Sequence, residues 1–409
     1  MAHFDVAVAG AGPAGLSAAL EAAAGGARVL LLERQPKPGR RLAATGNGRG
    51  NVGNRHLAEH RYNPESLPLI KGVSGVLDKD ALPAFLASLG IACSADEAGR
   101  LYPRSGQAAT MVWILNDLLQ ARGVTVEAGN GLMHFRKEAG VFLLQTADAA
   151  HESATLILAV GGQAQPKLGG GDHARRLLAD WDVGFRREMP ALAPLYTGTV
   201  LADGVRVPAA ARLYDAGDRL LQTADGEFQL TKTGVSGIAA MQLARTVNRL
   251  AAQKHLVFDF VPDMTKTALI TWLERIRSVN GQREARYILD SVLPAKLAVA
   301  LALAIAKQRQ NHELDDSHLR QLCAAAKETK LDVTGTAGWD QAQVMSGGVC
   351  AGEVNPVTLE SHRLPGLFMC GEMLDVDGDT GGYNLNWAFL SGRAAGRAAA
   401  RYVSSSKRR

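Results

Sequence analysis

The 409-residue sequence is poor in cysteine and in aromatic residues, and each shortage argues against a class of protein. Its four cysteines, Cys93, Cys323, Cys350 and Cys370, lie far apart and form no CxxC pair. The sequence therefore gives no support for a disulfide framework, a zinc site or a dithiol redox centre. Only 5% of the residues are aromatic, which leaves few side chains for stacking on nucleic-acid bases. The net charge of +5 comes from interspersed signs and does not by itself indicate a nucleic-acid partner.

Long apolar runs and targeting signals are also lacking. The first residues show no basic segment followed by a long apolar run, as a signal peptide would. The most apolar helix candidate, 297–306, is flanked by lysines and is too short to span a bilayer. We therefore expect a cytoplasmic protein without membrane association.

The strongest positive signal runs from Val6 to Arg34. A short apolar strand enters the turn 10–15, an alanine-rich helix follows, and a second apolar strand, 29–32, ends at Glu33. This order of strand, glycine-rich turn, helix and strand with a terminal acid is the context that a GxGxxG dinucleotide fingerprint requires. It predicts that the turn and the helix N-terminus bind a pyrophosphate, and that Glu33 accepts hydrogen bonds from a ribose.

Each glycine of the turn has its own predicted role. Gly10 permits the tight turn, Gly12 lets the backbone approach the pyrophosphate, and Gly15 lets the helix pack on the strand. Because the fingerprint opens the chain and several hundred residues follow it, we expect FAD, with NAD as the alternative. The predicted cofactor residues of this segment are Gly10, Ala11, Gly12, Pro13, Ala14, Gly15, Glu33 and Arg34.

A loop dense in glycine, arginine and asparagine follows at 39–54. Backbone N–H groups that glycine leaves accessible, with arginine beside them, form concavities that bind anions. The alternative is a flexible polar surface loop, but the position directly after the fingerprint favours a role in binding. The predicted cofactor residues of this loop are Arg41, Thr45, Gly46, Asn47, Gly48, Arg49 and Asn51.

The same loop resembles a segment of the BaiN-like flavoproteins, which include sequences named as aminoacetone-oxidase-type. Their loop has the form GRKLLxTGxGRCNxTN, and Gly39 to Asn54 follows it closely, with Gly50 where the family often has cysteine. Arg100 to Ser105 resembles the family's R-x-[FY]-P segment. Thr231 to Gly237 resembles its THxGxSGP segment, with Lys232 in place of histidine.

The closing segment carries the second strong signal. A buried strand is predicted at 367–370; Gly371 and Glu372 follow it, and a helix is expected from Trp387 to Tyr402. In many FAD enzymes such a carboxylate holds a ribityl hydroxyl and the helix N-terminus faces the flavin ring. The family's GEVLDVDGxTGGYNLQ segment is matched nearly throughout at 371–386. The further predicted cofactor residues are Gly371, Glu372, Asp379, Gly382, Tyr383, Asn384 and Leu385, together with Gly161 after the strand 156–160 and Val126 in the strand 123–127.

The predicted fold class is α/β, with a discontinuous Rossmann-type FAD-binding domain similar to that of glutathione reductase. Its two parts are expected at 1–190 and 340–409. Short alternating runs with frequent turns predict an inserted β-domain at 191–262. Apolar residues at helical spacing predict an inserted helical subdomain at 263–339.

The residues and the resemblance together predict an FAD-dependent oxidoreductase that transfers hydride through its flavin to or from a small organic substrate. The resemblance leaves both an NAD(P)H-linked reductase and an amine oxidase open. A flavin-dependent RNA-modifying enzyme and a redox-regulatory flavin-binding protein are the alternatives, and scarce aromatic residues argue against nucleic acid. No second fingerprint lies between residues 150 and 340, so NAD(P)H is expected only as a transient electron donor. No motif indicates a catalytic group, a metal site, the substrate's identity or the oligomeric state.

Overall fold

The computed structural model describes residues 2–406 of the chain. Contacts divide the chain into two compact units, the first formed by Met1–Met189 with Val344–Arg409 and the second by Pro190–Gln343. We call them the dinucleotide unit and the inserted unit.

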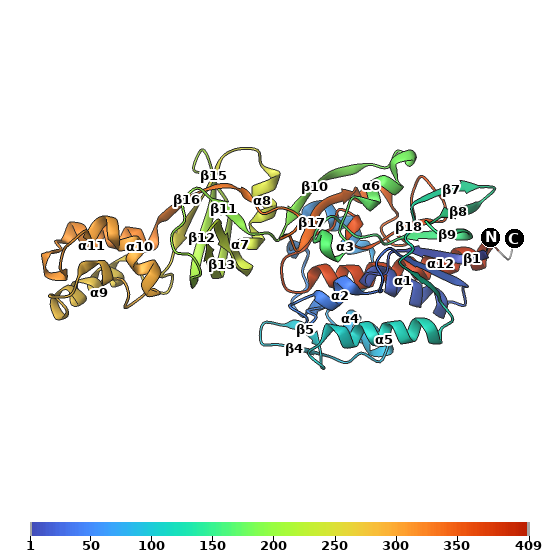
Figure 1. The fold of residues 1–409 in the computed structure, drawn as a ribbon, viewed down its shortest axis with the longest axis horizontal. Coiled ribbons are helices and arrows are strands. Elements are labelled where there is room, and N and C mark those ends of the chain that lie inside the picture. Colours follow the sequence, from blue (N-terminus) through green and yellow to red (C-terminus); the bar gives the residue numbers. More distant parts are fainter. Residues whose placement is uncertain (1, 407–409) are drawn as a thin grey trace. The chain divides into compact units, whose positions relative to one another are not determined.

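The dinucleotide unit is built on a mixed sheet in which β1 (Ala2–Ala9) lies between β2 (Val29–Glu33) and β9 (Ala150–Leu158). Figure 1 labels β1 and β9 of this sheet. The strand order is β6-β2-β1-β9-β8-β7, and β18 also pairs with β9. β6, β2, β1, β9 and β18 run parallel, whereas β7, β8 and the first part of β9 form an antiparallel meander. β2 reads as a continuous apolar run, VLLL, whose residues are all buried, as expected for a parallel strand covered on both faces. The other strands of this sheet are β6 (Thr125–Ala128), β7 (His134–Glu138), β8 (Val141–Gln145) and β18 (Leu367–Met369).

Smaller elements of the dinucleotide unit surround this sheet. A three-stranded sheet has the order β3-β5-β4, and β10 pairs with β17 as the chain leaves the unit and returns to it. The strands are β3 (Gly53–Asn54), β4 (Cys93–Ala95), β5 (Arg100–Pro103), β10 (Phe185–Ala191) and β17 (Val344–Val349). The helices are α2 (Arg40–Ala44), α3 (Leu67–Gly72), α4 (Ala81–Ser88), α5 (Ala108–Ala121) and α6 (His173–Leu177).

Two helices far apart in sequence, α1 (Pro13–Ala24) and α12 (Tyr383–Ser406), pack against each other and against the sheet. α1 starts with proline at its first position and ends at Gly25, as the usual preferences for helix termini predict. The two backbones approach very closely. A Cβ built on Gly392 lies 2.0 Å from the Ala14 carbonyl oxygen, and one on Gly396 lies 2.3 Å from that of Ala18. Glycine is therefore required at both positions of α12.

The inserted unit contains a closed barrel with the strand order β11-β14-β13-β12-β15-β16. Burial alternates along β12, so that every second side chain points inward. Phe228 and Phe258 meet edge to face in the interior, with ring centroids 5.0 Å apart. The strands are β11 (Leu195–Thr197), β12 (Arg206–Asp215), β13 (Leu220–Thr231), β14 (Gly234–Ser236), β15 (Lys254–Asp259) and β16 (Thr329–Thr336), and the short helices are α7 (Ile238–Gln242) and α8 (Ala244–Arg249).

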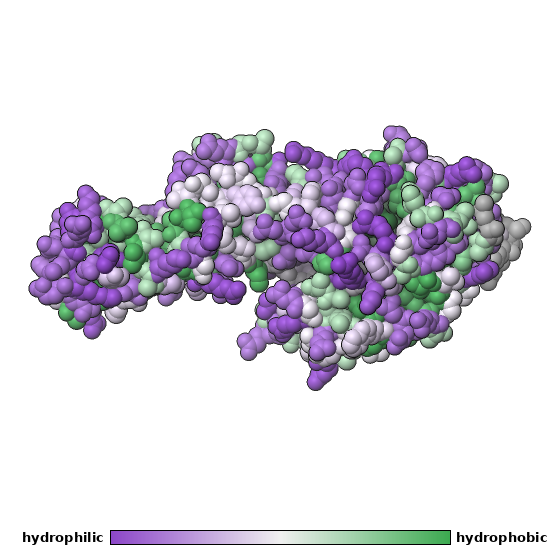
Figure 2. All heavy atoms as spheres, in the orientation of Figure 1, coloured by the Kyte–Doolittle hydropathy of each residue, from purple (hydrophilic) through white to green (hydrophobic). Residues whose placement is uncertain are grey.

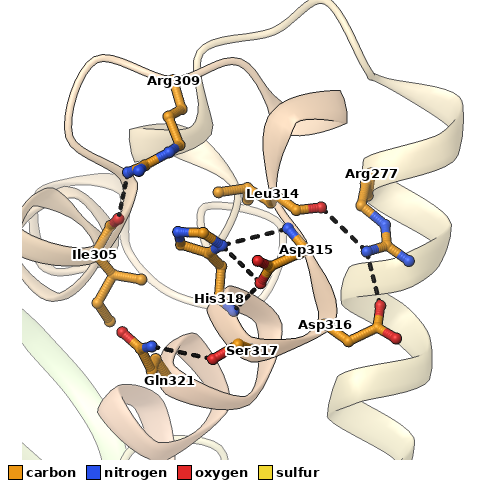
Figure 3. Close-up of polar contacts among 9 residues, drawn as sticks. All are labelled: Arg277, Ile305, Arg309, Leu314, Asp315, Asp316, Ser317, His318 and Gln321. Carbon is orange, nitrogen blue, oxygen red and sulfur yellow. Dashed lines mark hydrogen bonds and ion pairs between the residues drawn. The ribbon is translucent and has the colours of Figure 1, made fainter.

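Three helices, α9 (Lys266–Val279), α10 (Ala295–Ala306) and α11 (Asp316–Lys327), are inserted between β15 and β16. Side chains fix their ends (Figure 3). The Asp315 carboxylate accepts the His318 backbone N–H at 2.9 Å, which caps α11. Arg277 of α9 donates to Asp316 at 2.9 Å and to the Leu314 carbonyl at 3.1 Å, and so ties α9 to the start of α11.

Two element boundaries differ from those expected from sequence. α12 begins at Tyr383 rather than Trp387, because Gly381 and Gly382, with φ of 113° and 100°, end the non-helical run and the helix follows at once. The expected helical segment 263–339 ends in β16, which pairs with β15 and β11 and completes the barrel. Within residues 2–406, no helix is long and apolar enough to cross a bilayer.

The close contact between α1 and α12 gives a test of the fold. Alanine in place of Gly396 gains about 1 kcal/mol of helix propensity, but its Cβ meets the backbone of Ala18, which cannot move aside. We expect Gly396→Ala to lower the free energy of unfolding by about 1–3 kcal/mol, measured by urea denaturation. Gly352→Ala is the control, because a Cβ at Gly352 has no neighbour within 4 Å. Unchanged or increased stability of Gly396→Ala contradicts the packing.

Candidate functional site

The glycine-rich turn after β1 places its three glycines in three different environments. A Cβ on Gly10 lies 2.4 Å from the Ala159 carbonyl oxygen, and one on Gly15 lies 1.8 Å from the Gly10 oxygen. Both glycines are thus required by packing within the protein. A Cβ on Gly12 meets no atom within 4 Å. The turn is therefore open at Gly12, beside the N-terminus of α1, where no side chain caps the helix. Open space and uncapped N–H groups fit a bound pyrophosphate.

Glu33 is fixed at the end of β2 by the backbone. Its Oε2 accepts the Ala11 N–H and its Oε1 accepts the Gln35 N–H, each at 2.6 Å. The carboxylate thus lies against the glycine-rich turn, and each oxygen retains a lone pair for a hydroxyl donor. This arrangement fits a ribose adjacent to the pyrophosphate.

Arg34 and Val126, two other predicted residues, have local structural contacts. Arg34 is exposed and donates to the Gly169 carbonyl at 3.0 Å. Val126 of β6 pairs with Leu31 of β2. Both lie next to the strand that ends in Glu33.

The structure brings Arg41, Gly161 and Glu372 together from three distant segments. Arg41 and Glu372 form a double contact, with Nη1 to Oε2 at 2.7 Å and Nη2 to Oε1 at 3.2 Å. A Cβ on Gly161 lies 3.8 Å from Arg41 Nη1 and 4.0 Å from Glu372 Oε2, so the absence of a side chain leaves the pair accessible from that side. Glu372 Oε1 also accepts the Met345 N–H at 2.9 Å.

This charged pair lies beside the first turn of α1. A Cβ on Gly371 comes within 2.8 Å of the Ala14 Cβ, which places the segment after β18 directly against the helix. The Gly371 carbonyl accepts the Trp387 indole N–H at 3.1 Å, and the Gly371 N–H donates to the Ser391 hydroxyl at 3.1 Å. The start of α12 therefore positions the carboxylate of Glu372.

The loop predicted to bind anions is held in an unusual backbone conformation. Gly46, Asn47 and Gly48 have φ of 60°, 55° and 83°. The Thr45 hydroxyl donates to the Arg41 carbonyl at 3.0 Å, and the Gly48 carbonyl accepts the Ala108 N–H at 2.8 Å. The loop is thus tied to α2 on one side and to α5 on the other.

Asn51 joins this loop to the closing segment. In the orientation that satisfies both ends of its amide, it donates to the Gly53 carbonyl at 3.0 Å and accepts the Gly382 N–H at 3.2 Å. A Cβ on Gly382 lies 2.2 Å from the Gly53 oxygen, so the two backbones touch. Asn54 adds a hydrogen bond to the Gly381 carbonyl at 2.9 Å.

Several side chains predicted to contact the cofactor brace the closing segment itself. The Tyr383 hydroxyl donates to the His56 carbonyl at 3.1 Å. The Asn384 amide pairs with both the N–H and the carbonyl of Gly378, at 2.8 and 3.0 Å. Asp379 forms an ion pair with Arg61 at 3.2 Å. Leu385 is half-buried in the first turn of α12.

Sequence reasoning missed two residues, Asn63 and Arg186, whose contacts hold the closing segment in place. The Asn63 amide nitrogen donates to the Asp375 carbonyl and to its carboxylate, both at 3.2 Å, and its oxygen accepts the Asp377 N–H at 3.0 Å. Asp375 is also paired with Arg186 at 2.7 Å. Periodicity gives no signal for such contacts, because Asn63 and Asp375 are separated by about three hundred residues in the sequence.

Three titratable side chains near the closing segment, those of Tyr62, Cys370 and Tyr383, are buried. Burial raises the pKa of the Tyr62 and Tyr383 phenols. Burial also raises the pKa of the Cys370 thiol to about 12. These groups stay protonated at neutral pH and are not general bases or thiolate nucleophiles. Among the residues that the structure describes, no group of three or more His, Cys, Asp or Glu side chains is arranged to hold a metal ion.

Comparison with known proteins identifies the family. The HI0933-like protein Rossmann domain family matches residues 4–398. The chain belongs to this family. It is 34% identical to the 3-dehydro-bile acid delta(4,6)-reductase of Clostridium scindens, over 97% of this chain and 98% of the relative. It is 26% identical to the ribosomal RNA dihydrouridine synthase of Escherichia coli, over 96% of each chain.

A solved structure shares the fold of this HI0933-like protein. The open conformation of a flavocytochrome c3 fumarate reductase aligns with a TM-score of 0.51 at 16% identity, over 98% of this chain and 79% of that chain. The predicted fold class and the predicted family resemblance are confirmed. The chain is an FAD-dependent oxidoreductase of the Rossmann type.

The environments of Gly12 and Gly15 predict opposite behaviour of two similar variants. Gly12→Ala should fold and unfold like the original protein, because its Cβ has no protein neighbour within 4 Å. It should carry little FAD, since the methyl group occupies the space for the pyrophosphate. Gly15→Ala should be strongly destabilised, because its Cβ meets the Gly10 oxygen at 1.8 Å. Thermal unfolding and flavin absorbance per chain measure both effects. Full flavin content in Gly12→Ala contradicts this assignment.

Glu33 gives a second test. Glu33→Ala removes a charged acceptor, and the FAD dissociation constant should rise by a factor equivalent to about 1–3 kcal/mol. Glu33→Gln keeps one acceptor oxygen and should have a smaller effect. Titration of the flavin-free protein with FAD, followed by flavin fluorescence, measures the change. Equal affinity of all three proteins means that Glu33 does not bind the ribose.

Proposed function

We propose that this protein is an NAD(P)H-linked, FAD-dependent reductase that adds hydride to an activated carbon–carbon double bond of a small organic molecule. The named relative with 34% identity is a delta(4,6)-reductase, and the dihydrouridine synthase is also named for reduction of a double bond. Full-length similarity to two enzymes whose names share this chemistry is the observation that carries the proposal. A small-molecule substrate is favoured because the reductase is the more similar of the two.

We propose a defined role for each part of the site in holding FAD. The turn at Gly12 and the start of α1 bind the pyrophosphate, and Glu33 binds the ribose. The Arg41–Glu372 pair lies beside the same helix turn and holds the chain that links pyrophosphate and ring. The backbone at 382–385 faces the ring, because its side chains are engaged elsewhere. Bound FAD supplies the hydride-transfer chemistry.

The inserted unit offers no second dinucleotide-binding unit for the electron donor. The inserted unit contains a barrel and helices but no strand–turn–helix unit with a second GxGxxG sequence. We propose that NAD(P)H binds transiently along the loop 46–51 and the segment 381–386, which Asn51 joins.

The same chemistry on a uracil base of RNA is the second candidate. Arg283 and Arg286 both lie over the Tyr287 ring, at 5.3 and 4.8 Å from its centroid, a pairing that sequence spacing did not reveal. The face of the α9–α11 helices visible in Figure 2 is mostly hydrophilic, with small apolar patches. However, Asp290 pairs with Arg283 and Glu284 with Arg286, so both guanidinium charges are compensated. RNA is therefore the less favoured substrate.

Stepwise flavin reduction and reoxidation test the proposal. Under anaerobic conditions, NADH or NADPH should bleach the flavin of the FAD-loaded protein. A steroid with a conjugated 4-en-3-one should then restore the flavin absorbance faster than a uridine oligonucleotide or air does. Failure of both nicotinamides to reduce the flavin contradicts the proposal. Reoxidation by the oligonucleotide alone supports the RNA candidate, and reoxidation by air alone indicates an oxidase.

A further inference from the structure

The exposed side chain of Arg49 lies on an aromatic ring next to the proposed NAD(P)H-binding loop. Its guanidinium carbon is 4.6 Å from the centroid of Tyr102, a residue of β5. The backbone beside Arg49 is held by α5, because the Gly48 carbonyl accepts the Ala108 N–H at 2.8 Å. A Cβ on Gly50 would lie 3.1 Å from the Ala108 Cβ, so the loop is packed against the start of α5.

This contact holds the guanidinium and leaves its hydrogen-bond donors unused. In the part of the chain that the structure describes, the Arg49 side chain contacts the Tyr102 ring and is engaged in no hydrogen bond or ion pair. Stacking on an aromatic face occupies one side of a planar guanidinium, and its N–H edges remain directed outward. Such edges match the geometry of a phosphate group. Tyr102 thus presents Arg49 as an ordered anion receptor.

Among the described residues, no ion pair joins an acidic side chain to Arg49. Asp96 lies in the β4–β5 hairpin, but its carboxylate accepts the Arg100 Nε–H at 2.8 Å and the Arg100 backbone N–H at 2.9 Å. Glu97 lies in the turn of the same hairpin and is exposed. Arg104, two residues after Tyr102, is exposed and adds positive charge. Arg49 and Arg104 are thus two exposed cations in the segments that contain the stacked pair and its aromatic ring.

The type of anion follows from where this pair lies. Only one residue separates Arg49 from Asn51, which contacts Gly382 in the segment proposed to face the flavin ring. A phosphate bound at Arg49 would therefore lie close in sequence to the contact that joins this loop to that segment. Enzymes that select NAD use a carboxylate for the ribose 2′-hydroxyl, whereas those that select NADP place an arginine at the 2′-phosphate. Here an arginine is presented, and the Asp96 carboxylate of the adjoining hairpin is already occupied.

We propose that Arg49, held by Tyr102, binds the 2′-phosphate of NADPH and makes the protein select NADPH over NADH. The inference rests on the proposed NAD(P)H-linked reductase function. It assigns to one residue of the loop a role in coenzyme choice rather than in FAD binding.

Binding of two matched nucleotides to the FAD-loaded protein tests the inference without turnover. Adenosine 2′,5′-bisphosphate and 5′-AMP differ only in the 2′-phosphate. Isothermal titration should show that the bisphosphate binds about tenfold more tightly, as expected for one charge-assisted contact. Equal affinities of the two nucleotides overturn the inference.

Three variants test whether Arg49 and Tyr102 cause the preference for the nucleotide with a 2′-phosphate. Arg49→Ala should abolish the difference between the nucleotides, and Tyr102→Leu should reduce it; the flavin content of each variant is measured first, so that loss of FAD is distinguished from loss of nucleotide discrimination. Arg275→Ala is the matched control, because Arg275 lies over Trp272 at 5.8 Å in the inserted unit. It should retain the full difference. If Arg49→Ala retains the difference, or loses its FAD, the assignment of Arg49 to the 2′-phosphate is wrong.

Flavin reduction separates this inference from the proposed function. Reduction by NADPH at about tenfold lower concentration than by NADH supports both. Equal reduction by the two coenzymes leaves the reductase function intact and overturns the role of Arg49. If neither coenzyme reduces the flavin, the reductase function fails, and tight binding of the bisphosphate that depends on Arg49 still shows an adenosine 2′-phosphate site.

Discussion

The dinucleotide unit depends on contacts between backbones that no side chain separates. Gly15 packs on the Gly10 carbonyl, and Gly10 packs on Ala159 at the end of β9. Gly392 of α12 then packs on the Ala14 carbonyl from another side. These contacts fix the start of α1 relative to β1, β9 and α12. The N–H groups of α1 thus become a preorganised anion site, because the surrounding backbone cannot shift without creating clashes.

Sequence was sufficient for elements that carry a local signal. The strand, turn and helix at 6–34 follow from apolar periodicity and glycine placement, and the structure has β1, α1 and β2 there. Frequent turns and short alternating runs indicated β structure after residue 190, and strands β11 to β15 lie in that region. Closure of the barrel by β16 could not be predicted, because a strand segment does not specify its partners across an insertion of three helices.

The candidate site was predictable to the level of segments rather than side chains. Sequence analysis named Arg41 and Glu372 in two separate segments, and only the fold shows them as a pair. Tyr383 and Asn384 were expected at the cofactor, yet their polar atoms bond to neighbouring backbone groups. The stacking of Arg49 on Tyr102 joins residues 53 positions apart and leaves no periodic trace in the sequence. Such pairings depend on tertiary structure, which local propensity does not encode.

The chain order of the barrel has a consequence for how the protein is made. β11 lies at Leu195–Thr197, whereas its partner β16 lies at Thr329–Thr336. During synthesis the first barrel strand emerges well before the strand that closes the ring, and the three helices are translated in the interval. Helices form from local contacts, whereas pairing across such a separation carries a large loop-closure cost. Until β16 is made, β15 and β11 lack the strand that joins them, and unpaired strand edges are prone to mispairing.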